Sequence, residues 1–173
     1  MRNPTPTPRL LNGKLVWYHP RVTTQGQPHW LDEDQQRIWR SFLNGVAKIN
    51  ERLEAELRPF GLDLGEYEIL VHLSESPERA LRMSDLAGRV RQSRSRLTHT
   101  VARMESKGLV SRMACPSDRR GVIAVMTTHG HELLADAAPC HVESVRSALV
   151  DPVDPADFQA LGRAMTAVIG VTD

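Results

Sequence analysis

Two short amphipathic segments joined by a tight turn restrict the fold of this chain more than any other feature. Residues 83–90 and 94–107 both hold apolar residues at helical spacing. In the second segment the apolar positions follow at i, i+4 and i+7: Leu97, Val101 and Met104. Ser93 stands where a residue that caps the second helix is expected. The apolar side faces inward and leaves a polar, basic outer side, which predicts a helix-turn-helix.

A predicted β-hairpin follows this pair of helices. Residues 109–114 and 121–126 are rich in β-forming residues and flank the segment CPSDRR, so we expect two strands joined by a loop over residues 115–120. A hairpin in this place is a wing, and its predicted tip carries Asp118, Arg119 and Arg120. Arginine suits a narrow minor groove of DNA, and a neighbouring aspartate can hold a guanidinium group in one orientation.

Positive charge is concentrated in the same part of the chain. The whole protein has a net charge of only +1, but residues 82–120 contain ten basic and three acidic residues, a net charge of +7. The remaining residues carry a net charge of −6. A near-neutral protein that gathers its positive charge in 39 consecutive residues is typical of one that binds a polyanion.

Base edges in the major groove are read by side chains near the start of a recognition helix. We therefore expect DNA contacts from the polar residues of the second helix and from the wing: Ser93, Arg94, Ser95, Arg96, Thr98, His99, Arg103, Asp118, Arg119 and Arg120. Arginine can bind guanine through two hydrogen bonds, and threonine can contact a thymine methyl group.

Helices are also predicted on both sides of this region. A long helix is expected over residues 32–58, another over 64–74, a third over 128–149 and a last one from Asp154-Pro155 onward. Residues 1–31 contain five prolines and no acidic residue, which indicates an arm rather than a helix. The apolar stripe of the long helix is widened by Trp39 and Leu43, and a partner chain would cover this surface.

The stretch RLTHTVARMESKGLVSRMACPSDRRGVIAVMT resembles the recognition helix and wing of the MarR family of winged-helix transcriptional regulators. The similarity extends over about residues 32–170, and Asp118 and Arg120 match the Asp-x-Arg pair of the family's wing. Residues 1–31 are longer than usual, and Arg82 stands where a small capping residue often occurs. The resemblance implies a mainly α-helical fold with a small β-hairpin wing (α+β), in which a winged helix-turn-helix lobe joins a helical dimerisation region.

The resemblance also implies a division of the chain and a set of partners. It gives an arm over residues 1–31, a dimerisation helix over 32–62, a DNA-binding domain over 63–127 and C-terminal dimerisation helices over 128–173. The implied protein is a homodimer that binds a pseudo-palindromic operator in double-stranded DNA and represses transcription. An aromatic or amphipathic small molecule is expected in a pocket lined by Trp39, Leu43, Tyr67, Val71, His72 and His141.

Four alternative functions are compatible with a chain of this size. An enzyme is disfavoured, because Cys140-His141 and the serines near His99 lack a nucleophile elbow and the chain shows no glycine-rich phosphate loop. A metal-responsive regulator of the same fold stays open, with these weak candidate ligands: Glu68, His72, His129, His131, Cys140 and His141. A redox-responsive regulator of the same fold is a further alternative. Its candidate residue is Cys115, because neighbouring arginines could lower the pKa of the Cys115 thiol. A winged-helix protein-interaction module that does not read DNA is the remaining alternative.

The sequence predicts no cofactor and no metal centre. The two cysteines fit a reducing compartment, the N-terminal residues lack the apolar core of a secretory signal, and no apolar run approaches the ~20 residues that span a bilayer. We therefore expect a cytoplasmic protein without a membrane partner.

Overall fold

The computed structural model describes residues 7–11, 14–18, 29–116 and 118–172. The chain divides into two compact units, residues 1–39 and residues 40–173. In the first unit, strands β1 (Thr7–Leu11) and β2 (Lys14–Tyr18) form an antiparallel hairpin with Thr7 opposite Tyr18. Neither strand follows from the proline-rich pattern, although the Asn-Gly dipeptide at residues 12–13 is a strong hairpin signal.

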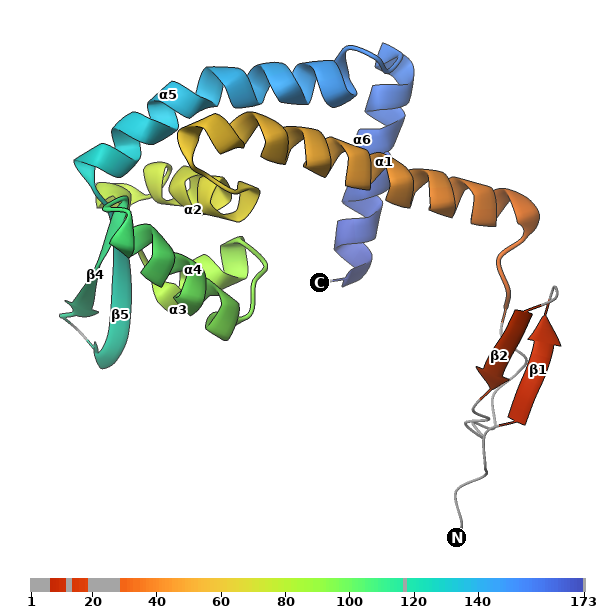
Figure 1. The fold of residues 1–173 in the computed structure, drawn as a ribbon, viewed down its shortest axis with the longest axis horizontal. Coiled ribbons are helices and arrows are strands. Elements are labelled where there is room, and N and C mark those ends of the chain that lie inside the picture. Colours follow the sequence, from red (N-terminus) through yellow and green to blue (C-terminus); the bar gives the residue numbers. More distant parts are fainter. Residues whose placement is uncertain (1–6, 12–13, 19–28, 117, 173) are drawn as a thin grey trace, which may run out of the picture. The chain divides into compact units, whose positions relative to one another are not determined.

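The described helices confirm the helical segments predicted from periodicity (Figure 1). They are α1 (Glu33–Leu57), α2 (Leu64–Ser74), α3 (Met83–Arg89), α4 (Arg94–Ser106), α5 (Thr128–Val145) and α6 (Pro155–Thr172). Short 3-10 turns cover Arg58–Phe60 and Pro77–Arg79, and a π-helical turn, Arg146–Val150, extends α5. No helix in the described ranges is both long and apolar enough to cross a membrane.

Side-chain caps explain where α2, α4 and α5 begin. The Asp63 carboxylate accepts a hydrogen bond from the Glu66 amide at 2.8 Å, and the Glu66 carboxylate accepts one from the Asp63 amide at 3.1 Å. This reciprocal capping box starts α2. Ser93 Oγ accepts from the Arg96 amide at the start of α4, and Thr127 Oγ1 accepts from the Gly130 amide at the start of α5.

The wing belongs to an antiparallel sheet of three strands in the order β3–β5–β4. These strands are β3 (Ala80–Arg82), β4 (Val110–Cys115) and β5 (Asp118–Met126). The predicted six-residue loop over 115–120 is wrong, because β4 includes Cys115 and β5 already begins at Asp118. Cys115 pairs with Asp118, and the register of the two strands shifts between Ala114 and Cys115. Backbone pairing with β4 thus extends the strand through polar residues that favour turns in isolation. Strand β3 was not predicted, since three residues are too few for a pattern.

The hydrophobic core lies within the lobe formed by α2, α3, α4, the sheet and the start of α5. Its centre includes Leu70, Leu86, Leu97 and Met104, all completely buried. The inward positions predicted for α4 are therefore confirmed. Burial of one such side chain contributes about 1.5–3 kcal/mol, so the core fixes the angle at which α4 is presented.

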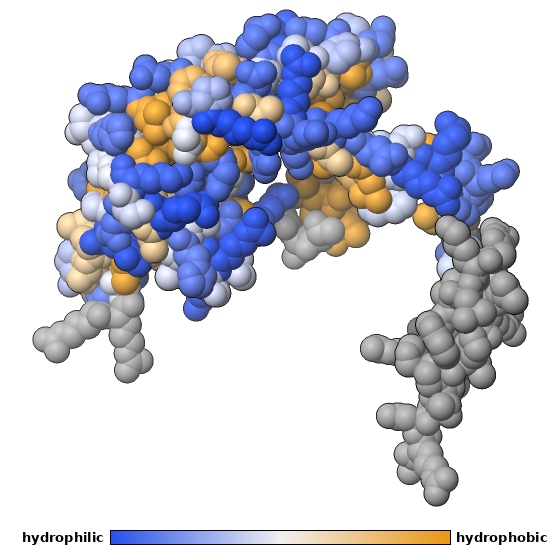
Figure 2. Space-filling model, viewed as in Figure 1, coloured by the Kyte–Doolittle hydropathy of each residue, from blue (hydrophilic) through white to orange (hydrophobic). Residues whose placement is uncertain are grey.

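Apolar side chains of α1 remain exposed in the single chain. Trp39 keeps 51% and Leu43 47% of their accessible surface, and Ile38, Phe42 and Val46 on the same helix are exposed as well. Only Leu53 and Leu57 of α1 are buried. Figure 2 shows hydrophobic patches over the long helices, whereas the visible face of the lobe with α3 and α4 is mostly hydrophilic.

Candidate DNA-binding surface

The first turns of α4 present basic and polar side chains to solvent. Arg94, Ser95, Arg96, Thr98 and His99 are all exposed. The Thr98 hydroxyl donates to the Arg94 carbonyl oxygen at 2.8 Å, which leaves its methyl group and its oxygen lone pairs available for a ligand. In the described ranges no ion pair engages Arg94 or Arg96. Both guanidinium groups are therefore available to an external anion.

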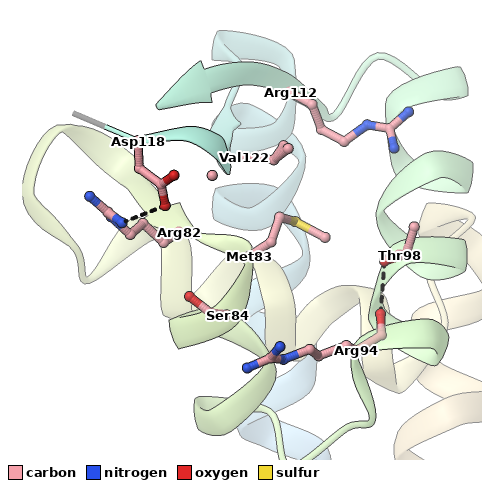
Figure 3. A pocket seen from close by; sticks show the side chains of 9 residues that line it. Arg82, Met83, Ser84, Arg94, Thr98, Arg112, Asp118 and Val122 are labelled. Carbon is pink, nitrogen blue, oxygen red and sulfur yellow. Dashed lines mark hydrogen bonds and ion pairs between the residues drawn. The ribbon is translucent and has the colours of Figure 1, made fainter. Parts of the chain in front are cut away.

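A groove of about 380 Å³ separates the start of α4 from the wing (Figure 3). Its lining joins α3, α4 and the three-stranded sheet: Arg82, Met83, Ser84, Arg94, Thr98, Arg112, Asp118, Gly121 and Val122. Among the residues predicted to contact DNA, Arg94, Thr98 and Asp118 meet here. Arg82, Ser84 and Arg112 were not assigned from the sequence, and the only signal for the two arginines was their place in the basic segment. We call this space the wing groove.

Ion pairs fix the wing to the neighbouring elements. Arg82 Nη1 lies 3.6 Å from Asp118 Oδ2, and this ion pair connects the end of β3 to the start of β5. Arg82 also precedes α3 at the N-cap position, but its side chain does not cap that helix. Arg112 Nη2 lies 2.6 Å from Glu105 Oε2, which connects β4 to the last turn of α4. The backbone of Arg119 and Arg120 belongs to β5, and their side chains lie outside the described part of the structure.

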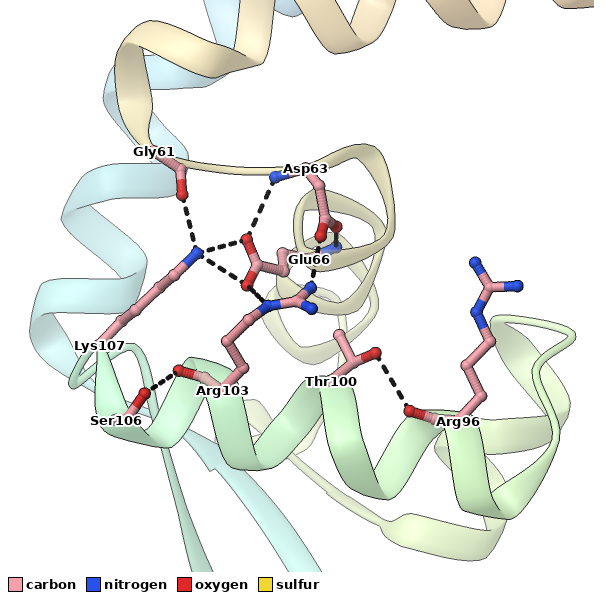
Figure 4. A network of polar contacts seen from close by, with 8 residues as sticks. All are labelled: Gly61, Asp63, Glu66, Arg96, Thr100, Arg103, Ser106 and Lys107. Carbon is pink, nitrogen blue, oxygen red and sulfur yellow. Dashed lines mark hydrogen bonds and ion pairs between the residues drawn. The ribbon is translucent and has the colours of Figure 1, made fainter.

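Arg103, which was predicted to contact DNA, takes part in an internal network (Figure 4). Its Nε donates to Glu66 Oε1 at 2.8 Å, and its Nη2 also pairs with Asp63. Lys107 Nζ lies 2.8 Å from both Glu66 carboxylate oxygens and donates to the Gly61 carbonyl at 2.9 Å. The Glu66 side chain is only 1% exposed. We call Asp63, Glu66, Arg103 and Lys107 the Glu66 network. It lies at the end of α4 remote from the exposed arginines.

The Glu66 network predicts a specific dependence of stability on pH. Burial alone would raise the pKa of Glu66, but hydrogen bonds from Lys107 and Arg103 outweigh it and hold the pKa below its usual value of 4.5. A depressed folded-state pKa contributes stability above pH 4.5, and that contribution is lost as the pH falls through the lowered pKa. Glu66→Gln should therefore flatten the dependence of unfolding free energy on pH below 4.5. Urea unfolding of both proteins from pH 3 to 7 measures this, and parallel pH curves would contradict it.

A second cavity, of about 370 Å³, lies between α2 and α5. Its lining is Leu53, Leu64, Tyr67, Glu68, Val71 and His141, and we call it the Tyr67–His141 cavity. The rings of Tyr67 and His141 are 4.2 Å apart between centroids and tilted by 34°. The structure thus brings three of the predicted pocket residues together, Tyr67, Val71 and His141. The described lining does not include Trp39, Leu43 or His72.

Burial favours the neutral forms of the two rings that face each other in this cavity. Burial lowers the pKa of His141 and raises the pKa of Tyr67. His141 Nδ1 is buried and has no hydrogen-bond partner among the described residues. An unpartnered buried nitrogen is costly unless a ligand or water satisfies it. The cavity can therefore accommodate a mostly apolar molecule that offers one polar atom to His141.

The candidate metal ligands do not assemble in the described ranges. No group of three His, Cys, Asp or Glu side chains there has the geometry to hold an ion. Burial and the Glu56 carboxylate, 3.6 Å from Cys140 Sγ, raise the pKa of the Cys140 thiol, which disfavours the reactive thiolate. Cys115 is 6% exposed at the end of β4.

Comparison with known proteins assigns this architecture to a family. Residues 62–122 match the model of the MarR family. AbsC, a MarR family transcriptional regulator from Streptomyces coelicolor, has 44% sequence identity to this chain. Its crystal structure matches the present structure with a TM-score of 0.80, over 84% of this chain and 98% of AbsC. The chain belongs to the MarR family. This membership confirms the mainly α-helical winged-helix fold with its small sheet and identifies the chain as a transcriptional regulator.

Other members of the MarR family match over similar lengths. Sco3205 from Streptomyces coelicolor, solved in complex with DNA, is 40% identical with a TM-score of 0.80, and the match covers 84% of this chain and 91% of that one. The HTH-type transcriptional regulator MhqR of Bacillus subtilis is 28% identical over 118 residues, which are 66% of this chain and 78% of that protein. The matches extend well beyond the winged-helix lobe, so the resemblance covers most of the helical region as well.

Proposed function

We propose that this chain is a homodimeric, sequence-specific DNA-binding regulator that acts by binding rather than by catalysis. In this proposal, α4 enters the major groove of an operator and the wing reaches the adjacent minor groove. The observation that carries it is the exposure of Arg94 and Arg96 on the first turns of α4, where neither forms an ion pair with the residues that the structure describes. Arg94 also lines the wing groove. Repression is the expected outcome, by exclusion of polymerase from the operator.

The distribution of ion pairs supports this assignment. In the described part of the basic segment, four residues have acidic partners inside the protein. They lie at the end of β3, toward the C-terminal end of α4 and on β4: Arg82, Arg103, Lys107 and Arg112. Arg94 and Arg96, at the opposite end of α4, have none in the described ranges. Recognition helices use their first turns to read bases, which is where the available guanidinium groups stand. Ser93, Ser95, Thr98, His99, Asp118, Arg119 and Arg120 complete the proposed contacts.

The exposed apolar surface of α1 supports the proposed dimer. Single chains rarely expose contiguous large apolar side chains such as Trp39, Phe42 and Leu43, and a two-fold interface would cover them in both copies. We assign residues 32–62 and 128–173 to dimerisation and residues 63–127 to DNA binding. The two recognition helices would then read half-sites roughly 10 bp apart.

The Tyr67–His141 cavity is the proposed site of a small effector. Apart from Glu68 the lining is aliphatic or aromatic, and His141 Nδ1 has no hydrogen-bond partner among the described residues. These features suit an aromatic or amphipathic molecule better than a metal ion. Binding there would release DNA if the occupied state presents the two lobes at a different spacing.

Selection of bound duplexes from a random pool tests the proposed function, followed by affinity measurements from low to high salt. We expect a two-fold symmetric sequence and a steep decrease of affinity with salt, since each neutralised phosphate adds about −0.9 to the logarithmic slope. A protein-interaction module would enrich no sequence and would bind its partner almost independently of salt. That result would overturn the proposal.

A further inference from the structure

The first turn of α2 contacts two different parts of the lobe through adjacent residues. Glu66 faces α4 and is 1% exposed, whereas Tyr67 packs against His141 of α5 and is 7% exposed. Consecutive residues of a helix point about 100° apart, so one rigid turn touches both neighbours. Any displacement of the helix backbone at Tyr67 must therefore also displace Glu66.

The contacts of Glu66 are strong and directional. Its carboxylate accepts from Arg103 Nε at 2.8 Å, from Lys107 Nζ at 2.8 Å and from the Asp63 amide at 3.1 Å. Hydrogen bonds between charged groups are about twice as strong as neutral ones, and burial increases the cost of breaking them. Because Arg103 and Lys107 occupy the C-terminal end of α4, this carboxylate holds that end of the helix against α2.

The opposite end of α4 carries the proposed base-reading residues. Arg94 precedes Arg103 by nine residues, which corresponds to about 13 Å along a helix. Rotation of α4 about its C-terminal attachment therefore moves Arg94 further than it moves Arg103. A displacement at Glu66 that turns α4 about this attachment would therefore change the position of the Arg94 guanidinium group relative to a bound base.

We propose that Glu66 is a positioning residue that transmits occupancy of the Tyr67–His141 cavity to the recognition helix. This inference rests on the proposed function and adds its mechanism of regulation. A molecule between Tyr67 and His141 shifts the first turn of α2, and the Glu66 network carries that shift to α4 through Arg103 and Lys107. Without the Glu66 carboxylate, the cavity and the recognition helix lose this connection.

A double-mutant cycle tests the connection without knowledge of the effector. Val71→Trp places an indole group in the cavity in place of a ligand, and Val71 itself is not a member of the Glu66 network. Affinity for the selected operator is measured for the wild type, Val71→Trp, Glu66→Gln and the double variant. We expect Val71→Trp to weaken binding about tenfold in the wild type and less than twofold in Glu66→Gln, the range of an allosteric coupling.

Controls separate this inference from a purely structural role and from the proposed function. Glu75→Gln removes the same charge at the exposed end of α2 and should leave the tenfold effect of Val71→Trp intact. Val71→Phe replaces Val71→Trp in the cycle if thermal unfolding shows that the tryptophan variant is not folded. Independent, multiplicative effects of the two substitutions, or no effect of the cavity-filling residue alone, would overturn the coupling while leaving DNA binding established. Absence of salt-dependent operator binding by the wild type would instead overturn the proposed function.

Discussion

Gly130→Ala is expected to destabilise the protein by about 3 kcal/mol or more, the upper part of the range for an overpacked position. A Cβ atom at residue 130 would lie 2.1 Å from the Leu109 carbonyl oxygen and 3.0 Å from its carbon. These neighbours are backbone atoms, so no side-chain rotation relieves the overlap. The same carbonyl accepts a hydrogen bond from the Thr127 amide at 3.1 Å, and a shift of α5 would break that bond too.

Thermal unfolding measures this effect, and a loss of about 6–12 °C in Tm corresponds to 3 kcal/mol for a chain of this length. Gly88→Ala is the matched control, because nothing lies within 4 Å of a Cβ at that helical position. It should leave Tm unchanged or raise it slightly, since alanine favours helix more than glycine does. An unchanged unfolding temperature in Gly130→Ala would contradict the close approach of Gly130 to the Leu109 backbone.

Substitution of the exposed arginines should have the largest effect on DNA recognition. Arg94→Ala or Arg96→Ala is expected to reduce discrimination between the operator and a mismatched site by about 1–3 kcal/mol, on the order of 5- to 150-fold. The reason is geometric, because the planar guanidinium group can donate two hydrogen bonds to one guanine. Arg94→Lys is the sharper test, since lysine retains the charge and loses the fork.

The two substitutions at Arg94 should differ in their dependence on salt. Arg94→Lys should lose discrimination with an unchanged salt slope, whereas Arg94→Ala should lose discrimination and, if the side chain also neutralises a phosphate, about one unit of slope. Arg37→Ala in α1, where the arginine side chain is 71% exposed and pairs with Asp34, is the control and should match the wild type. Equal discrimination in Arg94→Lys and the wild type would show that this residue contributes charge alone.

Some residues of the proposed DNA-binding surface could be placed from the sequence, and others could not. Periodicity and the capping serine placed Arg94, Arg96 and Thr98 on the exposed side of α4, because helix register follows from residues three and four apart. The same reasoning assigned Arg103 to the DNA surface. The pairing of Arg103 with Glu66, 37 residues earlier in the chain, could not be predicted, because a contact between residues so far apart leaves no local pattern.

Residue type and spacing were sufficient to predict the helices, the caps of α2, α4 and α5, the helix-turn-helix and the concentration of positive charge. Each of these depends on interactions within about one turn of the chain, for which residue type and spacing are sufficient information. The pairing of β3 with the wing, the close approach of Gly130 to the Leu109 carbonyl and the contact of Arg103 with Glu66 became known only from the three-dimensional packing. The family resemblance had placed Tyr67 and His141 in one pocket, but the ring contact between them required the structure. These contacts join residues that are remote in sequence, and the burial that stabilises them depends on how whole helices pack rather than on any local pattern.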